Sequence, residues 1–243
     1  MRNDRPVAAD PDSWKLDELA HAGRENLDAR HVGRYDAKMD AEAAAEVGML
    51  ERAGLLGPGC TLVDIGAGSG QFALAAAGVC GRVVAVDVSP AMLERLAEKL
   101  DRDALAPVEP VRAGFLSYSH SGEPADVAYS RYALHHLPDF WKALALDRIA
   151  ALLRPGGVLR LWDVAYSFEP SEAERRIEAW LEQTSSADVE HGWTRAELAE
   201  HVRDEHSTFT WLLEPMIERA GFEILDADYD ASAVDARYLC RKT

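Results

Sequence analysis

The stretch that decides the fold reads Leu62-Val63-Asp64-Ile65-Gly66-Ala67-Gly68-Ser69-Gly70. An apolar strand pattern here runs directly into a glycine-rich turn, and a helical pattern follows. Glycine lets the backbone turn sharply and approach a ligand closely, because no Cβ stands in the way. The helix that follows presents free backbone N–H groups to a polar or anionic ligand group. The pattern therefore predicts a ligand site at the end of this strand.

A carboxylate follows at the end of the next predicted strand. Asp87 stands where an acid can accept both hydroxyls of a ribose. Dinucleotide-binding dehydrogenases use the spacing G-x-G-x-x-G, but Gln71 occupies the third glycine position and Gly70 comes one residue early. That spacing disfavours a pyrophosphate ligand. A nicotinamide-dependent oxidoreductase stays open as an alternative, as does a turn that serves only strand–helix packing.

Outward from this stretch, short apolar runs alternate with helical patterns, which is typical of βαβ units in a mostly parallel sheet. Ser89 is the expected N-cap of one helix, and Pro90 its first residue. Two capping boxes mark helix starts beyond the sheet, Ser171 with Glu174 and Thr194 with Glu197. Strands are expected at 60–65, 82–87, 107–112, 125–130, 157–164, 222–228 and 234–241, and helices at 12–22, 36–55, 69–79, 90–102, 138–153 and 208–220.

These elements predict an α/β fold, a Rossmann-like and mostly parallel seven-stranded sheet with helices on both faces. The last two strands are close enough in sequence to pair antiparallel. We expect four parts: N-terminal helices covering the ligand site (1–55), the ligand-binding core (56–165), a helical insertion or lid (166–207), and a final helix with a β-hairpin (208–243).

The composition of the chain disfavours some classes of binding partner. The 243 residues carry a formal net charge of −16, which disfavours nucleic acid because a phosphate backbone attracts clustered Lys and Arg. The chain shows no uninterrupted apolar stretch of membrane-spanning length and no apolar signal core near its N-terminus. Cys60, Cys80 and Cys240 are scattered, as in buried cysteines of a reducing compartment. We therefore expect a cytoplasmic protein without membrane or nucleic-acid partners.

Four segments, in order, resemble the motifs of class I S-adenosylmethionine-dependent methyltransferases of the small-molecule and quinone-type branch. They span about 60–165 and read Asp64–Gly70, Val84–Leu93, Asp126–Asp139 and Leu153–Gly157. The resemblance implies S-adenosylmethionine as methyl donor, S-adenosylhomocysteine as product, and a sheet that ends with an antiparallel strand. It also implies transfer to a small-molecule acceptor. A non-catalytic cofactor-binding domain and a protein methyltransferase stay open as alternatives.

The resemblance also assigns cofactor-binding positions. It places Gly66, Ala67 and Gly68 against the methionine part, with Asp64 near its amino group. Asp87 is expected at the ribose. Val88 and Met92 are expected to line the adenine pocket. Tyr35 is expected to cover the methionine end. Ser130, at the end of the fourth strand, is also expected to bind the cofactor. The third-strand motif departs from the family, because Ala113-Gly114-Phe115-Leu116 lacks the usual acid; backbone groups of Gly114 and Phe115 are expected to serve the adenine instead.

Methyl transfer from a sulfonium is an in-line displacement that mainly needs a positioned acceptor and exclusion of water. A general base is needed only where the acceptor must lose a proton. His135, His136 and Asp163 are the candidate catalytic residues, although a structural role for one histidine and a strand-end role for Asp163 stay open. No metal site is expected, since His201 and His206 are five residues apart and would point to different faces of a helix.

Overall fold

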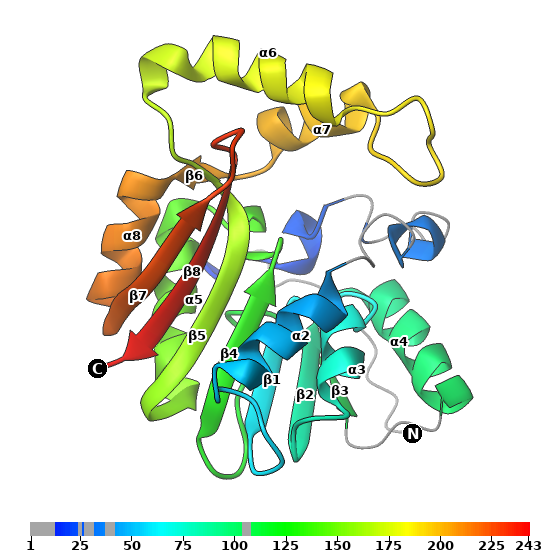
Figure 1. Ribbon diagram of the computed structural model, residues 1–243, viewed down its shortest axis with the longest axis vertical. Coiled ribbons are helices and arrows are strands. Elements are labelled where there is room, and N and C mark those ends of the chain that lie inside the picture. The colour runs from blue at the N-terminus through cyan, green and yellow to red at the C-terminus, as the bar shows by residue number, and fades with distance from the viewer. Residues whose placement is uncertain (1–12, 24–25, 27–31, 37–41, 104–107) are drawn as a thin grey trace.

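The computed structural model describes residues 13–23, 26, 32–36, 42–103 and 108–243 (Figure 1). Seven strands form the main sheet in the order β3-β2-β1-β4-β5-β8-β7. Strands β1 to β5 run parallel, and β8 is antiparallel to both of its neighbours. The predicted fold class is confirmed. The bounds are β1 Thr61–Ile65, β2 Arg82–Asp87, β3 Val108–Arg112, β4 Ala125–Arg131, β5 Leu153–Tyr166, β7 Phe222–Tyr229 and β8 Asp235–Lys242.

Helices cover both faces of the sheet, as predicted (Figure 1). Along β2, Val83 and Ala85 are buried with α2 (Ala43–Arg52), α3 (Gln71–Ala76) and α4 (Pro90–Asp103). The alternate residues Val84 and Val86 are buried with α5 (Asp139–Leu152) and α8 (Thr210–Arg219) on the other face. Strands that are covered on both sides become continuously apolar, which is why residues 83–86 are an unbroken run of valine and alanine.

The prediction of a helix at 12–22 is wrong for residues 13–22, which are the part of this range that the structure describes. Only one 3-10 turn forms there, η1 (Leu19–His21). The Asp17 carboxylate accepts hydrogen bonds from the backbone N–H groups of Leu19 and Ala20, at 3.1 and 3.4 Å. Such local side-chain bonds compete with helix formation. Of the second expected helix, 36–55, the structure forms α2 and residue 36, which ends a helical stretch at 32–36; residues 37–41 lie outside the described residues, and 53–55 are not helical.

The two expected capping boxes had different outcomes. Thr194 caps α7 (Arg195–Asp204) through a complete box with Glu197. The prediction of a capping box at Ser171 is wrong. Pro170 begins a short 3-10 turn, η3 (Pro170–Glu172), and Ser171 lies inside this turn. Helix α6 (Ala173–Thr184) therefore starts behind Glu172 without a side-chain cap. A two-residue strand that we did not predict, β6 (Thr208–Phe209), pairs parallel with the end of β5.

Helices α6 and α7 lie above the carboxyl ends of the central strands (Figure 1). Ile177 and Trp180 of α6 pack against a buried cluster that includes Val164, Tyr166 and Phe168. This contact holds the 166–207 segment at the edge of the sheet where open α/β proteins bind their ligands. Among the described helices, none is long and apolar enough to cross a membrane.

Candidate cofactor and acceptor site

The glycine turn after β1 has the backbone that the sequence predicts. Gly66 and Gly68 adopt φ angles of +75° and +53°, which side chains other than glycine strain to reach. The N–H groups of Gly66 and Ala67 donate to the Val86 carbonyl at 2.8 and 3.0 Å, and this ties the turn to β2. A Cβ at Gly66 would overlap Ala133. The turn can therefore pack against Ala133 only because residue 66 is glycine.

Asp87 joins the glycine turn to the start of α4. Its carboxylate accepts the Gly68 N–H at 2.7 Å and the Ser89 N–H at 2.8 Å. Ser89 in turn caps α4 by accepting the Met92 N–H at 3.2 Å, as predicted. Burial raises the pKa of Asp87, although these backbone bonds favour its ionised form. A carboxylate has about four lone-pair positions, so Asp87 retains acceptor capacity on the cleft that it lines.

Asp64 on β1 is the second buried acid at this site. Its Oδ2 atom has no hydrogen-bond partner among the described residues. Burial, together with the nearby charge of Asp87, raises the pKa of Asp64 to about 8. A buried and unsatisfied carboxylate oxygen is costly and calls for an explanation. A cationic ligand group beside Asp64 would satisfy it, which fits the amino group of S-adenosylmethionine.

A cleft with about 550 Å³ of open space lies over the glycine turn. Four of the expected cofactor residues do not line this cleft: Asp64, Ala67, Met92 and Ser130. Met92 and Ser130 are buried. The expected residues that do line it are Tyr35, Gly66, Gly68, Asp87, Val88, Gly114, Phe115 and His136.

Glu18 supplies a carboxylate where the third-strand motif lacks one. Its Oε1 accepts the Leu116 N–H at 3.0 Å, and its Oε2 accepts the Ser117 hydroxyl at 2.9 Å. Burial raises the pKa of Glu18, whereas these two hydrogen bonds oppose the rise. Glu18 also lines the cleft. This role of Glu18 could not be predicted from the sequence, because nothing near Glu18 in the chain indicates a contact with a turn almost a hundred residues away.

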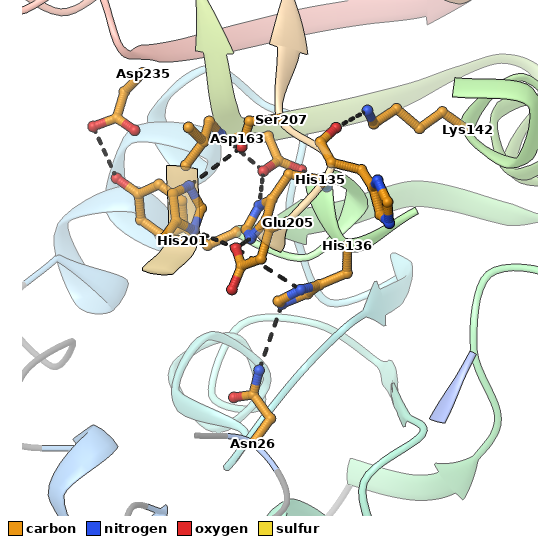
Figure 2. Close-up of polar contacts among 12 residues, drawn as sticks. Asn26, His135, His136, Lys142, Asp163, His201, Glu205, Ser207 and Asp235 are labelled. Carbon is orange, nitrogen blue, oxygen red and sulfur yellow. Dashed lines mark hydrogen bonds and ion pairs between the residues drawn. The ribbon is translucent and has the colours of Figure 1, made fainter. Parts of the chain in front are cut away.

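The two neighbouring histidines of η2 (Leu134–His136) point to different surroundings (Figure 2). His136 lines the cleft, and its Nε2 lies 3.5 Å from Asn26 Nδ2. Burial, with a smaller effect of His135, lowers the pKa of His136 to about 3. His135 instead shares a hydrogen bond between its Nδ1 and Asp163, and its backbone N–H donates to Asp163 at 3.1 Å. Of the three candidate catalytic residues, His136 alone lines the cleft.

Comparison with known proteins agrees with this geometry. The family model described as "Methyltransferase domain" matches residues 62–157. An uncharacterized methyltransferase from Geobacillus kaustophilus is 28% identical over 71% of this chain and 74% of its own length. The 27-O-demethylrifamycin SV methyltransferase of Amycolatopsis mediterranei is 32% identical over 63% of this chain and 57% of its own.

A solved structure shows the same fold with the reaction product in place. The magnesium protoporphyrin IX methyltransferase of Synechocystis, with bound S-adenosylhomocysteine, superposes with a TM-score of 0.61 at 14% identity. The match covers 93% of this chain and 92% of that one. The glycine turn, the two buried acids and the matched methyltransferase domain support one conclusion. Residues 62–157 form a methyltransferase domain of the class I S-adenosylmethionine-dependent type.

Proposed function

We propose that this enzyme methylates a small molecule held between the cofactor cleft, η2 and the 166–207 segment. The observation that carries the proposal is the position of His136. It lies on the cleft wall with Leu137 and Tyr132, and its Nδ1 is 4.0 Å from Oε2 of Glu205, the C-cap residue of α7. The relatives named for rifamycin and protoporphyrin substrates support a small acceptor. The net charge of −16 makes a nucleic acid an unfavourable partner.

The cofactor residues keep the roles that the resemblance implies. S-adenosylmethionine supplies an activated methyl group when bound. In this proposal Asp87 accepts the ribose hydroxyls, Asp64 faces the amino group, and the glycine turn lies against the methionine part. Glu18 stands with Gly114 and Phe115 on the adenine side. Ala67, Val88, Met92 and Ser130 shape the surroundings, and Tyr35 covers the turn: its ring lies 3.7 Å from where a Cβ would stand on Gly68.

The acceptor side needs little chemical machinery. In-line displacement depends on holding the acceptor close to the methyl group and on keeping water out. His136 offers a ring nitrogen, Nδ1, that has no hydrogen-bond partner among the described residues. Because burial lowers the pKa of His136 to about 3, the ring stays neutral and is a weak base, so we assign it to orient the acceptor by a hydrogen bond. His135 and Asp163 position His136 from behind, since the two imidazole rings pack 4.3 Å apart.

The 166–207 segment is proposed as the lid that excludes water from this reaction. The backbone N–H of His206 donates to the His135 carbonyl at 3.0 Å, so the end of α7 is attached to η2. The three cysteines of the chain are free and buried in the described structure.

Incubation with labelled S-adenosylmethionine and a metabolite extract tests this function. We expect label in low-molecular-mass products. His136→Ala should lower turnover by about tenfold to a hundredfold, because an acceptor that is no longer oriented reacts more slowly, and leave S-adenosylhomocysteine affinity unchanged. His191→Ala is the matched control, because that side chain is exposed and pairs only with Asp188 in the described structure. Label confined to protein, or full turnover in His136→Ala, would contradict the proposal.

The raised pKa of Asp64 predicts that cofactor binding releases a proton. With a pKa of about 8, the Asp64 carboxyl is protonated at neutral pH in the free protein. A cationic amino group beside it favours the ionised form, so the pKa falls on binding and a proton leaves at pH values below the free value. Calorimetry of S-adenosylhomocysteine binding at neutral pH should therefore show a heat that depends on the buffer's ionisation enthalpy.

Asp64→Asn supplies the comparison for this linkage. The amide cannot ionise, so the same titration should give equal binding heats in all buffers. Buffer-independent heat in the unaltered chain would show that Asp64 does not face the amino group.

A further inference from the structure

Three side chains outside the cofactor cleft form a compact group where α7 meets η2. His135, His201 and Glu205, the η2–α7 cluster, each offer one ligand atom, and these atoms lie within 4.8 Å of one another. Figure 2 shows the imidazoles and the carboxylate converging from the two elements. The cluster is largely buried, with side-chain exposures of 5%, 17% and 14% for His135, His201 and Glu205. None of the three lines the cofactor cleft.

The hydrogen bond to Asp163 decides which atom His135 presents. Because Asp163 accepts from Nδ1–H, Nε2 is the ring atom that faces Glu205, and it can donate an electron pair to a metal ion that replaces its proton. That Nε2 lies 3.0 Å from Glu205 Oε2. Oε2 is buried and has no hydrogen bond of acceptable geometry to any described residue. Two electron-rich atoms at this separation require a positive charge between them, either a proton or a metal ion.

His201 approaches the same carboxylate oxygen from the other side. Its Nδ1 contacts Glu205 Oε2, and its Nε2 lies 3.2 Å from the Ser207 hydroxyl. His201 and Glu205 are four residues apart, which places them on one face of the end of α7. The second nitrogen of each histidine is thus engaged by an oxygen, Asp163 in one case and Ser207 in the other. This is the usual arrangement around histidines that bind metals.

We propose that the η2–α7 cluster binds one divalent transition-metal ion of the zinc class. Its ligands are His135 Nε2, His201 Nδ1 and the Glu205 carboxylate. Two imidazoles and one carboxylate suit Zn²⁺, and three protein ligands leave a fourth position open. Asp163 orients His135 from the second shell of ligands. The ion joins the lid helix to η2, and Glu205 Oε2 is 4.0 Å from Nδ1 of the cleft residue His136.

The expectation of no metal site is revised by this proposal. It compared His201 with His206 as residues of one helix, but α7 ends at Asp204, so His206 lies beyond it. The partner of His201 on its own helix is Glu205, and the third ligand comes from η2 on the opposite side of the lid contact. Spacing in the sequence can show that His201 and Glu205 lie near each other, but it cannot show that His135 lies opposite them.

Metal titration of the full chain tests the site independently of methyl transfer. After treatment with a chelator, the protein should bind one equivalent of Zn²⁺ at neutral pH, and Co²⁺ should give visible bands of a low-symmetry site. His201→Ala and Glu205→Gln should weaken Zn²⁺ affinity on the order of 100-fold or more, and Asp163→Asn about 10–100-fold, as for outer-shell partners. His191→Ala, which removes an exposed histidine, should bind Zn²⁺ like the unaltered chain.

Binding of S-adenosylhomocysteine serves as the control for correct folding of each variant. Each variant is titrated with S-adenosylhomocysteine, and those that bind it are folded enough to count. At a Zn²⁺ concentration of 100 times the dissociation constant, the unaltered chain should gain about 2.7 kcal/mol in stability. Zn²⁺ binding that is equal in the unaltered chain, His201→Ala and Glu205→Gln, or the absence of a stabilising effect, would overturn the site. The cluster would then be an ion-pair network held by protons.

Discussion

Asp87→Ala should weaken binding of S-adenosylmethionine and S-adenosylhomocysteine by about 1.5–3 kcal/mol, the loss expected for hydrogen bonds to a charged group. That loss corresponds to roughly tenfold to a hundredfold in the dissociation constant. The substitution removes the acceptor proposed for the ribose. It also releases the Gly68 and Ser89 N–H groups, which the carboxylate holds at 2.7 and 2.8 Å. Isothermal titration with S-adenosylhomocysteine measures the change directly.

Asp226→Ala is the control for this prediction. Asp226 also lies in a strand of the main sheet, β7, but its side chain is exposed and distant from the cleft. We expect its affinity for S-adenosylhomocysteine to match that of the unaltered chain. An unchanged dissociation constant in Asp87→Ala, with the chain still folded, would contradict the assignment of the ribose site to the end of β2.

The cofactor turn could be predicted from sequence because its determinants are local. Gly66, Gly68 and Asp87 belong to two consecutive strand ends, and their backbone angles and hydrogen bonds depend on residues nearby in the chain. The same holds for the Ser89 cap and the Thr194 capping box. Where a competing local feature intervened, as Pro170 did beside Ser171, the local rule failed.

The rest of the candidate site depends on contacts between distant segments. Glu18 reaches the turn after β3 only because the N-terminal segment crosses the cleft. His135 and His136 are adjacent in sequence, so periodicity could not tell which one faces the ligand; the tight 3-10 turn separates them. Glu205 gave no sequence signal at all, since an acid near a helix end is ordinary until His135 is seen opposite it.

A buried ion pair attaches the N-terminal segment to the cofactor turn. Asp36 accepts from Lys99 Nζ at 2.7 Å and from the Ser69 hydroxyl, and the two charged side chains are only 12% and 10% exposed. Burial opposes ionisation of Asp36, but the hydrogen bonds from Lys99 and Ser69 outweigh it and hold the pKa of Asp36 below its usual value. Asp36 directly follows Tyr35, which lines the cleft.

Asp36→Asn should destabilise the fold by about 3–5 kcal/mol, because it leaves the Lys99 ammonium buried without its counter-charge. For a chain of this length that loss lowers the melting temperature by roughly 10 °C. Chemical denaturation and thermal melting measure the change. Glu109→Gln is the control: Glu109 pairs with Arg82 at 2.8 Å, but the two side chains are 53% and 34% exposed. An exposed pair of this kind contributes about 0–1 kcal/mol.

The double variant Asp36→Asn with Lys99→Met separates the charge from the packing. Replacing both partners removes the stranded ammonium, so the double variant should be more stable than Asp36→Asn alone. If the two substitutions instead add, the ion pair is not the source of the destabilisation. Because Ser69 donates to Asp36 from within the glycine-rich stretch, both variants should also bind S-adenosylhomocysteine more weakly. If Asp36→Asn is destabilised but its affinity for S-adenosylhomocysteine is unchanged, the Asp36–Lys99 ion pair stabilises the fold without shaping the cofactor turn.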